Sequence, residues 1–137
     1  MEKDIVLPSI DDEGFVAPGL HLLIDYWGCE GMQDEQGIGE TLREAAKACG
    51  ATVLDVQLHS FGENSGVTGV ATLAESHISI HTWPEIDYVA LDVFVCGACK
   101  PYAALDVLAD FFKPARSQVS VHERGIARSE KGKAATA

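Results

Sequence analysis

Residues 51–61 read ATVLDVQLHSF and carry the clearest structural pattern in the chain. Two sets of side chains alternate along this stretch: Leu54, Val56 and Leu58 in one set, Val53, Asp55 and Gln57 in the other. A period of two predicts a β-strand. The next five residues, GENSG at 62–66, have the composition of a turn, so the strand is expected to end there.

Further β-rich segments lie on both sides of this strand. LHLLIDYW is apolar and partly aromatic, too short for a typical helix and followed by Gly28, so it predicts a largely buried strand. Downstream segments of the same kind are VTGVATLAES (67–76), HISIHTW (77–83), DYVALDVFVCG (87–97) and RSQVSVHER (116–124). The chain is therefore expected to be dominated by one sheet.

Two segments have helical patterns instead. From Asp34 onward, apolar positions recur at the helical spacing, and Gly50 stands where the helix should end. These positions are Ile38, Leu42, Ala45, Ala46 and Cys49. KPYAALDVLADFFKP (100–114) predicts a second helix, because Pro101 suits a first turn and Pro114 stops the element.

The resulting order β, α, β, β, β, α, β predicts an α+β fold. We expect a two-layer α/β sandwich, with a mainly antiparallel sheet and both helices on one face. Segments 20–27 and 89–95 look apolar on both sides, so the second face is expected to be buried in a homodimer, with active sites near the subunit junction. Residues 19–125 are expected to form a single domain, between a flexible leader (1–18) and a polar tail (126–137).

Composition narrows the possible partners. The 137 residues are 47% hydrophobic, which fits one domain with a real core. A net charge of −11 argues against a nucleic-acid or anionic membrane partner and favours a small cationic ligand. We find neither an apolar run of membrane-spanning length nor an export signal, so we expect a cytoplasmic protein whose four cysteines are reduced.

Residues 72–83, TLAESHISIHTW, crowd histidines and hydroxyl groups into one short segment. In a regular strand two sets of side chains would face opposite ways: Glu75, His77, Ser79 and His81 on one side, Ser76, Ile78, Ile80 and Thr82 on the other. One interpretation is a half-solvated strand with surface histidines. A second is a zinc site made by two histidines and the two cysteines of CGAC, namely His77, His81, Cys96 and Cys99.

A third interpretation is nucleophilic catalysis by Ser76, activated by a histidine. The sequence lacks a G-x-S-x-G elbow, which argues against ordinary hydrolase chemistry. ESHISIHTWPE (75–85), followed by DVFVCG (92–97), resembles the core motif of bacterial and archaeal S-adenosylmethionine decarboxylases. In weaker form the resemblance covers most of residues 19–125.

The resemblance implies a proenzyme that cuts itself between Glu75 and Ser76, giving a β chain (1–75) and an α chain (76–137). The serine hydroxyl attacks the preceding carbonyl to form an ester, and β-elimination leaves a covalent pyruvoyl cofactor derived from Ser76. That group forms a Schiff base with the substrate amine and acts as an electron sink. No metal is implied.

Three further residues receive roles from the same resemblance. His81 transfers the proton in the elimination, and Thr68 stands where the family usually has a serine that assists processing. Cys96 matches the donor that reprotonates the substrate carbon, a task that suits a thiol because it gives and recovers a proton readily.

Substrate recognition follows in the same way. Phe61 and Trp83 are expected to stack on the adenine, and Glu85 is expected to bind the ribose hydroxyls. Aromatic faces also attract a sulfonium cation. The implied activity is decarboxylation of S-adenosylmethionine, which supplies the aminopropyl donor for spermidine synthesis.

Two departures from the family pattern lie near this expected site. The turn after Phe61 is one residue longer than usual, and Asp87 replaces a common glycine. Glu63 and Asp87 together favour a substrate with a second amino group, so a pyruvoyl-dependent decarboxylase of ornithine or arginine in polyamine synthesis is the alternative. A second alternative is a regulatory homologue that never cleaves itself.

Overall fold

The computed structural model describes residues 15–16, 19–96, 98–125 and 127–128. Most of the predicted leader (1–18) and tail (126–137) lies outside the described residues. Within those two segments, β1 (Phe15–Val16) and β8 (Ala127–Arg128) pair antiparallel as a small two-stranded sheet.

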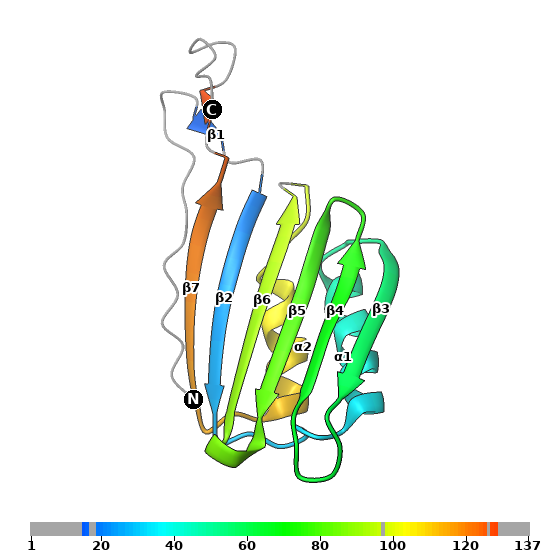
Figure 1. Ribbon diagram of the computed structural model, residues 1–137. Helices are drawn as coiled ribbons and strands as arrows, with labels where there is room; N and C mark the ends of the chain where they lie inside the picture. Colours follow the sequence, from blue (N-terminus) through cyan, green and yellow to red (C-terminus); the bar gives the residue numbers. More distant parts are fainter. Residues whose placement is uncertain (1–14, 17–18, 97, 126, 129–137) are drawn as a thin grey trace.

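The main sheet has six strands in the order β3-β4-β5-β6-β2-β7, and every neighbouring pair is antiparallel. They are β2 (Gly19–Trp27), β3 (Val53–Ser60), β4 (Val67–Leu73), β5 (Ser76–Trp83), β6 (Tyr88–Cys96) and β7 (Arg116–Arg124). The helices α1 (Glu35–Ala48) and α2 (Ala103–Phe112) cover the same face, as Figure 1 shows. The predicted α+β sandwich is therefore confirmed.

The predicted order has one strand too few. Four strands lie between the helices, because the chain turns at Ala74 and Glu75 and so separates β4 from β5. Neither residue is typical of a turn, and Glu75 reaches the left-handed region, with a φ of 61°, that glycine usually takes. The β-rich segments 67–76 and 77–83 were distinguished in the sequence, but no turn-type residue marks the boundary between them.

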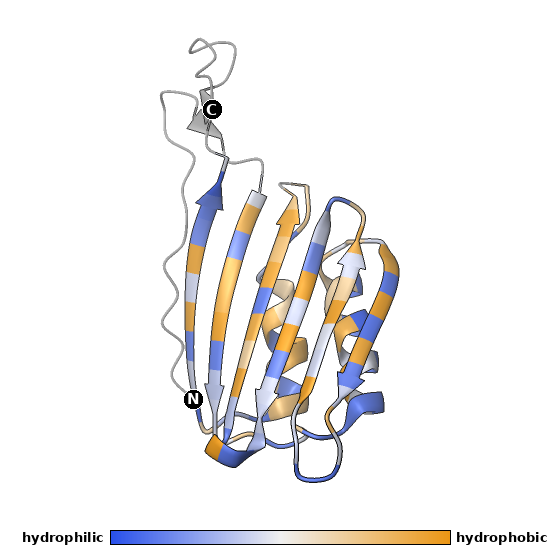
Figure 2. Cartoon of the chain, viewed as in Figure 1, coloured by the Kyte–Doolittle hydropathy of each residue, from blue (hydrophilic) through white to orange (hydrophobic). Residues whose placement is uncertain are grey.

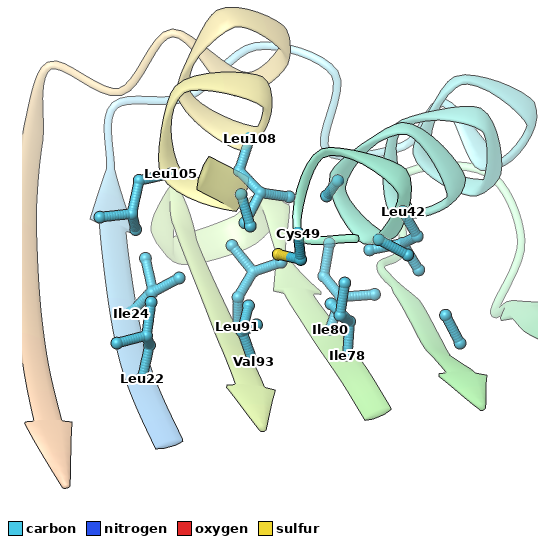
Figure 3. Packing of buried hydrophobic residues seen from close by; sticks show 14 of the residues in the cluster. Leu22, Ile24, Leu42, Cys49, Ile78, Ile80, Leu91, Val93, Leu105 and Leu108 are labelled. Carbon is cyan, nitrogen blue, oxygen red and sulfur yellow. The ribbon is translucent and has the colours of Figure 1, made fainter. Parts of the chain in front are cut away.

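The core lies between the sheet and the helices. Along the strands hydrophobic and hydrophilic residues alternate, as Figure 2 shows, and the helix-facing set is buried. In Figure 3, α2 places Leu105 and Leu108 over the sheet. The strand residues in the same cluster include Leu22, Ile24, Ile78, Ile80, Leu91 and Val93. None of the described helices has the length and apolar character needed to cross a membrane.

The first helix begins and ends where its sequence predicts. Asp34 caps α1, and its carboxylate accepts a hydrogen bond from the backbone N–H of Gly37 at 3.0 Å. Gly50, with a φ of 81°, follows the C-terminal end. Ile38, Leu42, Ala45 and Ala46 are fully buried, so the predicted apolar stripe faces the sheet.

The predicted alternation of β3 is wrong at Leu54. The register against β4 shifts between Val53 and Asp55, which marks a β-bulge. As a result Val53 packs against the core with Val56 and Leu58, whereas Leu54 is 64% exposed. A bulge changes which face a residue occupies, and the period of the sequence alone does not reveal it.

Candidate active site

The sheet face opposite the helices, called the open face below, carries the polar residues of β5. Ile78, Ile80 and Thr82 are buried beneath the helices. His77 and Ser79 are half-buried and His81 is exposed, as expected for the alternate set. The predicted division of this strand is confirmed, except that Glu75 belongs to the preceding turn.

The cleavage cluster, defined as Glu75, Ser76 and Cys96, lies where β5 begins and β6 ends. The Ser76 hydroxyl oxygen accepts a hydrogen bond from the backbone N–H of Cys96 at 3.2 Å. Glu75 and Cys96 line a cavity of about 520 Å³, together with Phe94 and Arg124. The left-handed backbone of Glu75 costs about 1–2 kcal/mol for a residue with a side chain, so the residue just before the bond expected to break has a strained backbone conformation.

A second group, the His81 cluster, lies at the opposite end of β5. Its members are Phe61, Thr68, His81, Trp83 and Glu85, and they line one cavity of about 370 Å³. The Thr68 hydroxyl lies 3.3 Å from His81 Nδ1, because these residues are direct partners across β4 and β5. The structure therefore brings together five residues that the family resemblance singled out.

The two clusters do not meet within one chain. Ser76 and His81 are five residues apart along β5, which is about 16 Å at the usual rise of an extended strand. A base must come within about 3 Å of the proton that it removes. His81 therefore cannot take the Cα proton of Ser76 in its own chain.

The two acidic residues expected near the substrate have different surroundings. Glu63 is exposed in the loop between β3 and β4. Asp87 follows the short 3-10 helix η1 (Pro84–Ile86), and its carboxylate accepts a hydrogen bond from the backbone N–H of Cys29 at 3.1 Å. Asp87 thus ties this turn to the segment after β2.

A hydrogen-bonded network occupies the centre of the open face. One carboxylate oxygen of Asp92 lies 2.5 Å from His21 Nε2 and 2.8 Å from His77 Nε2, and the other accepts from the Ser79 hydroxyl. Burial alone would raise the pKa of Asp92, but hydrogen bonds from Ser79, His21 and His77 outweigh it and lower the pKa. His21 and Asp92 are far apart in sequence, so no sequence pattern indicated this network.

The same network shows why this centre differs from a metal site. His21, His77 and Asp92 offer ligand atoms within 4.8 Å of one another. However, Arg124 Nη1 lies 2.9 Å from His21 Nδ1, and a guanidinium can only donate. His21 Nδ1 must then accept, so Nε2 carries the hydrogen and donates it to Asp92 instead of binding a cation.

The zinc set considered from the sequence is not assembled. His77 and His81 are four residues apart on one strand, about 13 Å. Cys96 and Cys99 lie close together at the end of β6, with their sulfur atoms 3.7 Å apart. The four residues do not converge on one point, so the zinc hypothesis is wrong.

The segment extending from β2 to β7 matches a known family. The sequence model described as S-adenosylmethionine decarboxylase matches residues 20–125. An S-adenosylmethionine decarboxylase proenzyme of Methanococcus maripaludis is 49% identical over 111 residues, covering 79% of this chain and 90% of the relative. One from Thermomicrobium roseum is 43% identical over 109 residues, covering 79% and 94%.

A solved structure has the same fold. The crystal structure of the adenosylmethionine decarboxylase from Aquifex aeolicus superimposes with a TM-score of 0.71 at 38% sequence identity. The alignment covers 80% of this chain and 92% of that one. Sequence and fold therefore agree on the same group of proteins.

Proposed function

The chain belongs to the S-adenosylmethionine decarboxylase family, and on that premise we propose that it is a self-cleaving decarboxylase of S-adenosylmethionine. Its product would be the aminopropyl donor for spermidine synthesis. The observation that carries the proposal is the strained turn at Glu75, followed directly by a serine whose hydroxyl lies beside the backbone of Cys96.

The local geometry suits self-cleavage. The Ser76 hydroxyl attacks the carbonyl carbon of Glu75, the peptide C–N bond breaks, and an ester joins the two residues. Because the oxygen of Ser76 accepts the N–H of Cys96, its own hydrogen remains free to be removed. Loss of the Ser76 Cα proton then expels the Glu75 carboxylate and leaves a dehydroalanine. This group tautomerises to an imine, and water hydrolyses the imine to the pyruvoyl carbonyl with release of ammonia.

The residues around Ser76 fit a pyruvoyl cofactor. Such a group supplies a carbonyl that draws electrons from the bond between the substrate Cα and its carboxylate. Cys96 lines the same cavity as Glu75, which supports the proposal that its thiol returns a proton to the substrate carbon.

The substrate's nucleoside belongs in the His81 cluster. Phe61 and Trp83 present exposed rings, 61% and 40% exposed, to the same cavity as the Glu85 carboxylate. The rings are suited to stack on adenine, and the carboxylate is suited to accept hydrogen bonds from ribose hydroxyls. Glu63 and Asp87 remain proposed contributors to the choice of substrate.

A second copy of the chain completes the site in this proposal. Two copies that stack their open faces with β5 running in opposite directions bring the cleavage cluster of one against the His81 cluster of the other. Each dimer then has two sites, and His81 acts on the partner's Ser76. A cytoplasmic location belongs to the same proposal, since a reducing compartment keeps the four free thiols reduced.

Release of labelled carbon dioxide tests the activity. Purified protein is given S-adenosylmethionine, ornithine or arginine, and the masses of its fragments are measured on the same sample. We expect cleavage after Glu75 and release from S-adenosylmethionine alone. Ser76→Ala is the control and should stay intact and inactive. An intact wild-type chain would support a regulatory homologue, and release from ornithine or arginine would overturn the substrate assignment.

Mixing two inactive variants tests the shared site. Ser76→Ala and His81→Ala chains are co-expressed with different tags, and cleavage of each is followed by mass. In a mixed dimer the His81→Ala chain keeps its serine and meets an intact His81 of its partner, so we expect it to mature. Failure of that chain to mature in a confirmed mixed dimer would show that the site is not shared.

A further inference from the structure

Two thiols lie side by side next to the cleavage cluster. Cys96 ends β6, and Cys99 follows three residues later, before α2 begins. Their sulfur atoms are 3.7 Å apart and make a thiol–thiol contact. The spacing is that of a C-x-x-C pair, which can close into a disulfide.

Only one member of this pair has a task in the proposed reaction. Cys96 is the proton donor beside Ser76, whereas Cys99 has no assigned role. Cys99 is half-buried, and burial followed by the contact with Cys96 raises its pKa. A raised pKa keeps the thiol of Cys99 protonated at neutral pH, so this residue reacts slowly by itself.

We propose that Cys96 and Cys99 form a reversible disulfide, with a hydroperoxide as the oxidant, and that this bond switches the decarboxylase off. The loss of activity rests on the proposed function, because it follows from removing the proton donor. Formation of the disulfide rests on the two sulfur positions alone.

Oxidation of the two thiols to a disulfide needs no reactant other than the hydroperoxide. The thiolate of Cys96 attacks one oxygen of the hydroperoxide, the O–O bond breaks, and a sulfenic acid forms as water or an alcohol leaves. The thiol of Cys99 then attacks that sulfur, loses its proton and displaces water. Two thiols are oxidised to one disulfide, and the peroxide receives the two electrons.

Access and geometry both support these steps. Cys96 lines the cavity of about 520 Å³ that must admit a substrate much larger than a peroxide. The sulfur atoms must approach from 3.7 Å to about 2.05 Å, the length of an S–S bond. Side-chain rotation changes sulfur positions by this amount, so the sheet can remain in place.

Cys49 is the competing partner for Cys99. Its thiol is 2% exposed in the core and contacts the carbonyl oxygen of Pro101 at 3.9 Å. The backbone N–H of Lys100 also donates to the Cys49 carbonyl, so the two segments are neighbours. Burial raises the pKa of Cys49 to about 11, which makes this thiol a poor competitor.

Self-cleavage makes the test direct, because it separates the cysteines into pairs. Fragment 1–75 holds Cys29 and Cys49, and fragment 76–137 holds Cys96 and Cys99. Reduced, processed enzyme is treated with hydrogen peroxide, and activity, fragment masses and thiol alkylation are measured before and after dithiothreitol. We expect fragment 76–137 to lose two hydrogens while activity falls about tenfold or more, with dithiothreitol restoring both.

Two cysteine variants provide the controls. Cys99→Ser should keep basal activity within about twofold, but its peroxide-inactivated form should not recover with dithiothreitol, because a sulfenic acid without a neighbouring thiol oxidises further. Cys29→Ser should behave like the wild type. Burial and then Asp87 raise the pKa of Cys29 to about 12, so this thiol is expected to react slowly with peroxide.

Each remaining outcome contradicts a specific part of the proposal. Fragments joined to each other on a non-reducing gel would point to Cys49 and overturn the assigned pair. An active enzyme whose fragment 76–137 keeps its mass under peroxide would overturn the disulfide. A reduced enzyme that never cleaves or releases carbon dioxide would contradict the proposed function, while tryptic peptides of the intact chain would still report the disulfide.

Discussion

Ile80 and His81 are neighbours on β5, yet one is fully buried under the helices and the other is exposed on the open face. The covered face is almost wholly apolar, whereas the open face carries histidines, carboxylates and hydroxyls on the same strands. Because successive residues of a strand point to opposite faces, one strand can stabilise the fold and carry chemistry at once. Substitutions at adjacent residues of β5 should therefore have different effects, one on the stability of the fold and the other on self-cleavage.

The largest difference in the effect of a substitution is expected between Ile80 and His81. Ile80→Ala should lower the free energy of unfolding by about 2–5 kcal/mol, because it leaves a cavity in the core. His81→Ala should change that quantity by about 0.5 kcal/mol or less, but slow pyruvoyl formation by about 100-fold or more. Urea denaturation and the mass of fragment 76–137 measure the two effects, and equal loss of stability in both variants would contradict the division.

Asp92 tests whether the open face also contributes to stability. Its lowered pKa means that the native state favours the carboxylate, so this stabilisation is present above the unfolded-state pKa of about 4 and is lost as the pH falls through the native pKa. Asp92→Asn should cost about 1–3 kcal/mol at pH 7.

The difference in free energy of unfolding between wild type and Asp92→Asn should become smaller below about pH 4. Urea denaturation at a series of pH values, at fixed protein concentration, measures this difference. Asp55→Asn, at an exposed position on β3, is the matched control and should show little effect. A constant difference at all pH values would exclude Asp92 as the titrating group.

A smaller effect is expected for the aromatic row at one end of the open face. Trp27, Tyr88 and Trp83 stack in series, with ring centroids 5.7 Å and 5.4 Å apart. Trp83 alone among them lines the cavity of the His81 cluster. Trp83→Ala should raise KM for S-adenosylmethionine about tenfold, because base–aromatic stacking contributes about 1–3 kcal/mol, with kcat changed less.

Trp27→Ala is the control for that measurement, since it removes the other end of the same row. Its KM should remain near the wild-type value. An equal rise in KM for both variants would mean that the row acts through the packing of Tyr88 and not through contact with substrate.

The smallest effect is expected at Leu54, which the bulge of β3 places on the exposed side of the strand. Leu54→Ala should change the free energy of unfolding by about 0.5 kcal/mol or less, because the side chain is exposed. Leu58→Ala, on the same strand and packed against the core, should cost about 1–3 kcal/mol. Thermal or urea denaturation compares them, and similar losses would show that Leu54 is buried in solution.

Local patterns in the sequence were sufficient to predict most elements. Asp34 and Gly50 mark the ends of α1 because capping and left-handed backbone depend on single residues. The alternation of Ile78 and Ile80 with Ser79 and His81 likewise predicts which residues of β5 are buried. Such signals need no knowledge of the rest of the fold.

Features that depend on strand pairing were not predictable in this way. The contact of His21 with Asp92 exists only because β2 lies beside β6, and the position of Leu54 depends on a bulge. The separation of Ser76 from His81 also follows from geometry, since a motif that is continuous in sequence becomes a long extended segment on a strand. A motif thus identifies residues without showing that they meet.

The order of the strands gives the proposed cut after Glu75 a consequence for assembly. Fragment 1–75 contributes β2, β3, β4 and α1, while fragment 76–137 contributes β5, β6, β7 and α2. β2 lies between β6 and β7, so the two pieces are interleaved and share backbone hydrogen bonds at three seams of the six-stranded sheet. The pairing of β1 with β8 adds a fourth seam. The two fragments cannot dissociate without breaking the sheet. Once both are unfolded, they must first bind each other in solution before the fold can form again. Maturation would therefore change the refolding of each protomer from a reaction within one chain into a concentration-dependent association of two fragments.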